Sequence, residues 1–241
     1  NLRLFILDLK TGTLLRTIKL DSADGHPDID YGFAGSILNT TQDVDQDYQD
    51  DVVYVPYVKK QSASDAWTDG GILRLITKED LGGATLDHTG ACTSGMTALN
   101  PNCWAVSTVM DGIGPVSSSV VKLLNTKTDK FWLYFGTGRY YYELGSETDD
   151  GDNQRHLFGI TEPCYSNKAL TYDTTSALGT ACTTPRAIDS LATVILSTED
   201  GVTDDDGWKI LLDMCLNSAG TVVSCTDPFV YFRTERVVTD P

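Results

Sequence analysis

Several features that would point directly to a membrane or a nucleic acid are missing from this sequence. No apolar run approaches the roughly 18 residues of a membrane-spanning helix, and no segment shows a sustained helical period. Basic residues are scarce, because 18 Lys and Arg stand against 34 Asp and Glu, giving a net charge of -16. Nucleic acids and anionic membrane surfaces both attract clustered basic side chains. The composition therefore predicts no nucleic-acid partner and no direct membrane insertion.

A recognisable catalytic constellation is missing as well. The three histidines, His26, His88 and His156, are far apart, and none lies in a His-Glu-x-x-His motif. There is no Gly-x-Ser-x-Gly elbow. Gly136-Thr137-Gly138 is similar to part of a phosphate loop, but β-type residues follow it instead of a helix, so a glycine bulge or a tight strand crossing is the favoured interpretation. We therefore expect a protein that is not an enzyme.

The cysteines lack the C-x-x-C spacing of a zinc site. They instead form three pairs that are close in sequence order: Cys92–Cys103, Cys164–Cys182 and Cys215–Cys225. Each pair would close a loop of about ten to twenty residues, for which a disulfide contributes roughly 3 kcal/mol. Paired cysteines predict an oxidising, exported location. The alternative is six buried free thiols in a cytosolic protein, and spacing alone does not fix the connectivity.

Strand patterns are what the sequence does contain. Residues 4–9 and 14–18 are apolar runs on either side of Lys10-Thr11-Gly12, which predicts a β-hairpin. Residues 35–77 and 114–161 then resemble each other at an offset of about eighty residues. Each contains short β-type runs separated by polar turns. The sequence therefore predicts an all-β fold.

The repeat also predicts an architecture. Units of four short antiparallel strands with long loops on one side are typical of the blades of a β-propeller, here a partial or degenerate one. A weaker third copy is expected over residues 191–232. Because a blade needs neighbours to bury both its faces, residues 1–241 are expected to be part of a single propeller in a longer chain.

The strongest local signal is an acidic loop. Residues 43–51 read Asp43-Val44-Asp45-Gln46-Asp47-Tyr48-Gln49-Asp50-Asp51 and run into a β-branched strand. Ca²⁺ takes six to eight oxygen ligands, and a short loop supplies them by pointing alternate side chains inward. The bidentate Glu that closes a helix-loop-helix site at position twelve is missing, since that position is Tyr54. The loop therefore predicts a nine-residue calcium site, with Asp43, Asp45, Asp47 and Asp51 binding through carboxylates and Gln49 through its backbone oxygen.

Tyr48 is the departure from this pattern. The sixth position of such a loop usually holds Gly, because the turn favours a positive φ that a bulky residue reaches only at a cost. The residue therefore predicts weak binding, with a dissociation constant of about 10⁻⁴ M or somewhat lower. The alternative to a metal site is a solvated acidic loop between strands, in which five Asp would repel one another without a counterion.

A family resemblance connects these motifs. Several segments resemble the C-terminal propeller of PilY-type type IV pilus proteins, both in their residues and in their order along the chain. They are residues 43–54, Gly71-Ile72-Leu73-Arg74, residues 134–140, Leu157-Phe158-Gly159-Ile160, Gly207-Trp208 and residues 235–241. The resemblance covers most of the chain from about residue 30 onward. It implies an exported pilus-tip factor whose propeller holds one Ca²⁺ in the acidic loop.

The resemblance also implies a biological role. Calcium occupancy would modulate pilus extension and retraction, with minor pilins or the pilus tip complex as partners. The location would be extracellular or at the cell surface, and cell adhesion would be a further role. The N-terminal von Willebrand-like domain of longer family members is not found in this sequence. A secreted quinoprotein-like propeller enzyme is the alternative, because Leu7-Asp8-Leu9-Lys10-Thr11-Gly12 is similar to that family's blade-ending strand. A generic extracellular adhesion or filament component is a third possibility.

Overall fold

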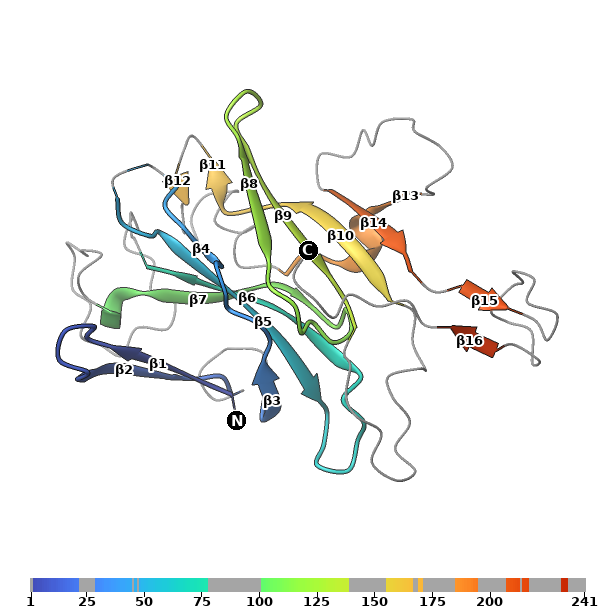
Figure 1. The fold of residues 1–241 in the computed structure, drawn as a ribbon, viewed down its shortest axis with the longest axis horizontal. Helices are drawn as coiled ribbons and strands as arrows, with labels where there is room; N and C mark the ends of the chain where they lie inside the picture. The colour runs from blue at the N-terminus through green and yellow to red at the C-terminus, as the bar shows by residue number, and fades with distance from the viewer. Residues whose placement is uncertain are drawn as a thin grey trace.

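The computed structural model has an all-β fold, which confirms the predicted fold class (Figure 1). Within its described residues the helical elements are two short 3₁₀ turns, η2 (Pro101–Cys103) and η3 (Ile188–Ser190). No helix in this part of the chain is long and apolar enough to cross a membrane. The structure describes residues 2–21, 29–44, 46, 48–77, 101–138, 155–166, 169–170, 185–194, 207–212, 214–216 and 231–233.

The first large sheet contains the strands of the first predicted repeat, residues 35–77, together with one strand before it and one after it. Its strand order is β3-β5-β6-β7, and β4 pairs with the other end of β5. All of these pairs are antiparallel. The strands are β3 (Tyr31–Ala34), β4 (Thr41–Gln42), β5 (Val52–Lys60), β6 (Asp69–Ile76) and β7 (Ala105–Asp111).

The second large sheet contains the strands of the second repeat, residues 114–161, together with two strands from further along the chain. Its order is β13-β14-β10-β9-β8. Strands β8, β9, β10 and β14 pair in antiparallel fashion, and β13 adds in parallel beside β14. The strands are β8 (Val121–Asn125), β9 (Lys130–Gly136), β10 (His156–Thr161), β13 (Ala192–Val194) and β14 (Gly207–Leu211).

Both sheets therefore contain a four-stranded antiparallel unit with a long insertion before the fourth strand. The units are β4-β5-β6-β7 and β8-β9-β10-β14. The segments that precede them touch directly, because the Ser36 N–H donates to the Ser117 carbonyl at 2.9 Å. This arrangement confirms the internal repeat and is consistent with two neighbouring blades of a partial propeller.

The expected third copy over residues 191–232 is wrong as a separate blade. Strands β13 and β14, which were assigned to it, instead complete the second sheet. The physical reason is visible at Gly159 on β10, whose missing side chain leaves the space that the Trp208 indole of β14 fills; a Cβ there would lie 2.4 Å from it. The remaining expected strand, β16 (Tyr231–Arg233), pairs with β15 (Met214–Leu216) in a small sheet of its own.

The predicted N-terminal hairpin is confirmed. Strands β1 (Arg3–Leu7) and β2 (Leu14–Lys19) pair in antiparallel fashion. In the turn, Asp8 Oδ1 accepts hydrogen bonds from the backbone N–H and the hydroxyl of Thr11, both at 2.7 Å. Gly12 follows with φ +71°, a conformation that glycine adopts without strain. A further two-stranded pair is formed by β11 (Tyr165–Ser166) and β12 (Ala169–Leu170).

The first large sheet is buried on both faces, which explains the nearly continuous apolar run of β5 and β6. One face packs against the hairpin, with Val55 and Leu73 in the same cluster as Ile18 and Leu20. The other face packs against the second sheet through a larger cluster. That cluster includes Tyr54, Ile72, Val109 and Met110 from the first sheet and Phe131, Leu133, Phe135, Phe158 and Ile160 from the second.

Candidate metal site

The acidic loop 43–51 connects β4 to β5, so its two ends are held side by side by strand pairing. Gln42 and Val52 are direct partners across the two strands. The Asp51 N–H donates to the Gln42 carbonyl, and the Asp51 carbonyl accepts from Thr77 N–H, both at 2.8 Å. The base of the loop is therefore fixed by the first sheet. In Figure 1 the loop lies at the end of β5 opposite the turn that leads into β6.

Asp43 curls the first half of the loop. Its Oδ1 accepts a hydrogen bond from Gln46 N–H at 2.6 Å, and its Oδ2 accepts one from Tyr48 N–H at 2.9 Å. An Asp side chain that bonds to backbone further along the chain is a common way to close a tight turn. The first predicted ligand thus holds the loop in a ring.

Asp51 holds the second half of the acidic loop through a buried hydrogen bond. It is buried, and its Oδ2 accepts a hydrogen bond from Val44 N–H at 2.7 Å. Val44 itself belongs to the core between the two sheets. The ninth position of the loop is therefore locked to the second position, and both are anchored in the core. The role of Asp51 as the ligand that closes a metal site stays a prediction.

Tyr48 adopts the conformation that its position requires. Its φ is +71°, and that of Gln46 is +66°. A left-handed conformation costs an L-residue other than Gly or Asn about 1–2 kcal/mol. The Tyr48 side chain is 98% exposed, so it points away from the interior of the loop. The positive φ predicted for the sixth position of the loop is confirmed at Tyr48. The exposed phenol ring does not fill the interior of the loop.

The predicted ligand set is brought together only in part by the described residues. Asp43, Gln49 and Asp51 lie on one hairpin loop, whereas Asp45 and Asp47 lie outside the described residues. Among the residues that are described, no group of three His, Cys, Asp or Glu side chains forms a metal site. The donors are all oxygen atoms, which suits Ca²⁺ and not a thiolate- or imidazole-binding metal. Calcium binding stays a prediction.

A lysine from the second sheet contacts the base of the loop. Lys122 on β8 donates to the Thr41 carbonyl at 2.7 Å and also to the carbonyl of Asn39. Burial lowers the pKa of Lys122, and the charge of Asp50 partly opposes this by raising it. Sequence reasoning missed this contact because β8 is distant along the chain. A signal was present, since a lysine between Val121 and Leu123 interrupts an apolar strand.

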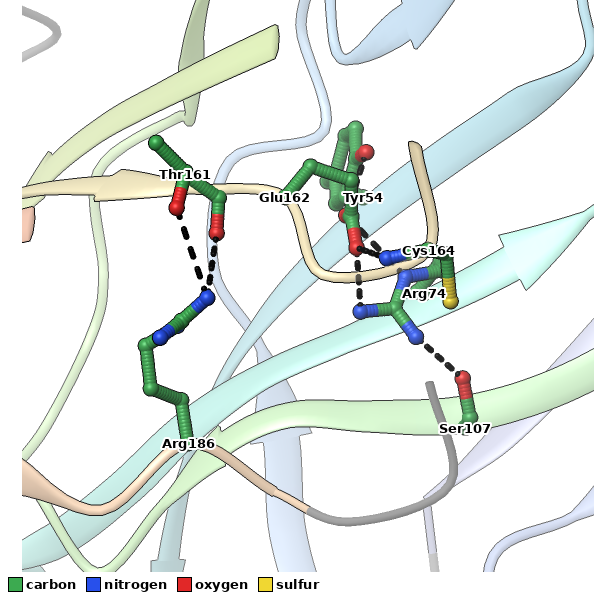
Figure 2. A network of polar contacts seen from close by, with 7 residues as sticks. All are labelled: Tyr54, Arg74, Ser107, Thr161, Glu162, Cys164 and Arg186. Carbon is green, nitrogen blue, oxygen red and sulfur yellow. Dashed lines mark hydrogen bonds and ion pairs between the residues drawn. The ribbon is translucent and has the colours of Figure 1, made fainter. Parts of the chain in front are cut away.

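A buried polar network joins the two sheets (Figure 2). Arg74 on β6 and Glu162 after β10 are both fully buried, and Arg74 Nη2 lies 2.6 Å from Glu162 Oε1. Arg74 Nε donates to Glu162 Oε2 at 3.0 Å, and Arg74 Nη1 donates to Ser107 Oγ at 2.7 Å. Two parallel contacts of this kind are the strongest form of Arg–carboxylate pair. The pair links β6 and β7 of the first sheet to the second.

Two further donors satisfy the same carboxylate. The Tyr54 hydroxyl donates to Glu162 Oε2 at 2.7 Å, and Cys164 N–H donates to Oε1 at 3.0 Å. Burial raises the pKa of Tyr54 well above its usual value, and the Glu162 charge raises it further, so the phenol remains a donor. Tyr54 lies on β5 shortly after Asp51. The strand that leaves the acidic loop thus makes this contact between the sheets near its start.

The phosphate-loop interpretation is also disfavoured by the geometry. Thr137 N–H donates to the His156 carbonyl at 2.8 Å, and Gly138 N–H donates to the Pro115 carbonyl at 2.7 Å. The backbone donors that would hold an anion are therefore engaged in strand contacts. Gly138 has φ +140° and bridges to Val116, which fits the predicted strand crossing.

His156 is buried on β10 and stacks on Phe158. Burial, together with the charges of Lys209 and Arg155, lowers its pKa to about 4. The imidazole is therefore neutral near pH 7. The other two histidines, the acidic clusters at 149–152 and 204–206 and the tyrosines at 140–142 lie outside the described residues.

One cysteine can be assessed. Cys164 is disulfide-bonded and buried. Cys182, its predicted partner, lies outside the described residues, so this pairing and the two others stay predictions.

Comparison with known proteins finds a similar fold in a solved structure. No protein-family model and no curated protein matches the sequence. The crystal structure of the Pseudomonas aeruginosa PilY1 C-terminal domain is similar with a TM-score of 0.51 and 15% sequence identity, over 87% of this chain and 44% of that chain. The likeness shows a shared fold only. This chain spans less than half the length of the structure it matches.

Proposed function

We propose that the protein is a non-enzymatic, calcium-binding propeller module of a type IV pilus biogenesis or tip factor. The observation that carries the proposal is the acidic loop, with five Asp in nine residues, curled by Asp43 and closed by buried Asp51 at the start of β5. The fold similarity to the PilY1 C-terminal domain supports the pilus context.

Ca²⁺ would act here as a counterion and a clamp. The ligands would be the carboxylates of Asp43, Asp45, Asp47 and Asp51 and the backbone oxygen of Gln49. Neutralising these carboxylates removes the repulsion that an Asp cluster otherwise suffers. Because the loop continues into β5, a fixed loop would also fix the strand that carries Tyr54 into the contact between the sheets.

The proposed biological consequence is control of the pilus. Calcium occupancy would modulate extension and retraction through a surface presented to minor pilins or to the pilus tip complex, and adhesion to other cells would be a further role. An exported, extracellular location is consistent with the disulfide at Cys164. The rest of the propeller would be an additional partner of these two blades.

Isothermal titration of calcium into the wild-type chain and two matched variants tests the proposal. Asp47→Ala removes a predicted ligand, whereas Asp65→Ala removes an exposed Asp from the turn before β6. We expect wild type and Asp65→Ala to bind with a dissociation constant of about 10⁻⁴ M and Asp47→Ala to bind at least about tenfold more weakly. Equal heats from wild type and Asp47→Ala would reject a calcium site in this loop.

A further inference from the structure

A second candidate site lies at the far end of β5, away from the acidic loop. A pocket of about 260 Å³ opens where β3 begins, β5 ends and β6 begins. Its volume is slightly below the roughly 300–1,000 Å³ of pockets that hold drug-sized ligands, so it admits about one six-membered ring. Its lining residues are Asp30, Tyr31, Lys59, Lys60, Gln61 and Asp69.

The pocket lining carries two carboxylates and two ammonium groups. The ammonium groups have protein partners, and Lys59 is held by Asp111, a third carboxylate beside the lining. Lys59 Nζ donates to Asp111 Oδ2 at 2.8 Å and lies 3.7 Å from Asp69 Oδ2. Lys60 Nζ donates to the Ala63 carbonyl at 2.5 Å. A ligand with a net charge of either sign would therefore meet repulsion as well as attraction.

Aromatic rings flank the same opening. Tyr31 is 43% exposed, and the Lys60 ammonium lies 5.9 Å from its ring centroid and 4.8 Å from that of Trp67. Phe33 packs edge-on against Trp67 with 5.1 Å between centroids, which fixes that ring. The rim therefore offers a partly exposed, positioned aromatic surface beside the polar lining.

Two polar groups of the pocket have no protein partner within the described part of the chain. Gln61 is exposed and its amide makes no hydrogen bond there. The Tyr31 hydroxyl likewise makes none, although its ring contacts Lys60. An amide supplies both donors and acceptors, and a phenol supplies one of each kind. These are the groups that can bind a ligand without first breaking a contact.

We propose that this pocket binds a neutral pyranose, as the terminal sugar of a glycan. A sugar hydroxyl both donates and accepts, so it needs the mixed lining of carboxylate, ammonium, amide and phenol that is present. The C–H face of the ring is apolar and would pack on Tyr31, which is the exposed aromatic side chain. Phosphate and carboxylate ligands are disfavoured by the nearby carboxylates of Asp30, Asp69 and Asp111, and amine ligands by the two lysines of the lining.

The proposed sugar site and the proposed calcium site use different residues. They lie at opposite ends of the nine-residue strand β5, which at about 3.3 Å per residue separates them by roughly 26 Å. The sugar site would give the proposed adhesion role a ligand, and it is expected to bind with or without calcium. Failure of one proposal therefore leaves the other standing.

Saturation-transfer NMR on the whole chain, in buffer containing a calcium chelator, tests the sugar site. The probes are the methyl pyranosides of glucose, galactose, mannose and N-acetylglucosamine, with acetate and methylamine as charged controls. We expect saturation transfer to at least one pyranoside and none to the charged probes. Tyr31→Ala should weaken binding at least about tenfold, because it removes the stacking surface.

Two variants keep the test decisive. Gln61→Ala changes an exposed residue directly after β5, and it should also weaken binding. Tyr48→Ala removes an exposed tyrosine at the opposite end of β5 and should leave binding unchanged. Absence of transfer to every pyranoside overturns the proposal. So does transfer that survives both Tyr31→Ala and Gln61→Ala, or that Tyr48→Ala reduces equally.

Discussion

The β4–β5 loop and the β8–β9 loop occupy the same position in the two blades but are closed by different chemistry. Each connects a directly paired couple, Gln42 with Val52 in the first blade and Asn125 with Lys130 in the second. Each also contains residues other than glycine with positive φ. Both loops therefore join two paired strand ends and need a left-handed backbone conformation.

In the second blade, the β8–β9 loop is closed mainly by a neutral side chain, Asn125. Asn125 Oδ1 accepts hydrogen bonds from Lys127 N–H at 3.1 Å and Thr128 N–H at 3.2 Å. Asp129, with φ +51°, accepts a hydrogen bond from the Tyr165 hydroxyl at 2.8 Å. This turn contains one carboxylate and one lysine, Lys127, and a second lysine, Lys130, follows it directly. It needs no external cation.

The first blade uses the same kind of side-chain-to-backbone bond, through Asp43, but surrounds it with further carboxylates. Asp51 has a role in the fold, because it accepts a hydrogen bond from Val44 N–H. The second blade shows that turn formation alone does not require the other additional Asp residues, and the proposed cation accounts for them. This difference between equivalent positions is the strongest structural argument for reading the loop as a cation site.

The largest expected effect comes from breaking the junction on which both blades depend. Arg74→Ala should leave the Glu162 charge buried without its main partner, which destabilises a protein by about 3–5 kcal/mol. Urea unfolding measures this directly. Replacing both partners, with Arg74→Met and Glu162→Met, should recover most of the loss, because no charge is then buried. The exposed Lys127→Ala is the control, and a loss below about 1 kcal/mol in Arg74→Ala would contradict the assigned role.

A smaller effect is expected from exchanging the loops themselves. Replacing residues 43–51 by the turn Thr126-Lys127-Thr128-Asp129, with Gln42→Asn to supply the cap, should abolish the calcium dependence of stability. In wild type, about 1 mM free Ca²⁺ should add about 1.4 kcal/mol for a dissociation constant of about 10⁻⁴ M. Thermal unfolding with calcium and with chelator compares the two chains. A calcium-dependent shift that persists in the exchanged chain would place the ion elsewhere.

Sequence patterns predicted the parts of the fold that depend on local chemistry. The β1–β2 hairpin, the repeat and the acidic loop each follow from residue spacing, and the structure confirms the first two and the turn of the third. Long-range partners were not predictable in this way. Lys122 contacts the loop base and Glu162 pairs with Arg74 across the sheets. Both charged residues lie within or beside apolar strands, which shows that a partner is needed but not which one.

The prediction of a third blade was wrong for a related reason. Residues 207–211 read equally well as a new blade or as the fourth strand of the second one, since strand patterning does not specify a partner. The choice was made by Gly159, whose lack of a side chain allows Trp208 to lie across β10. Such a contact between distant residues is not visible in periodicity.

The smallest expected effect concerns the strain at the tip of the acidic loop. Tyr48→Gly removes a left-handed conformation that costs about 1–2 kcal/mol, while glycine gives back about 0.5–1 kcal/mol through the greater freedom of the unfolded chain. Because the Tyr48 side chain is 98% exposed, little packing is lost, and urea unfolding should show a net gain of about 0.5–1 kcal/mol. The matched change Asp129→Gly in the second blade should show no gain, since it also removes the bond from the Tyr165 hydroxyl. Equal gains from the two variants would mean that the loops differ in composition but not in how they are held.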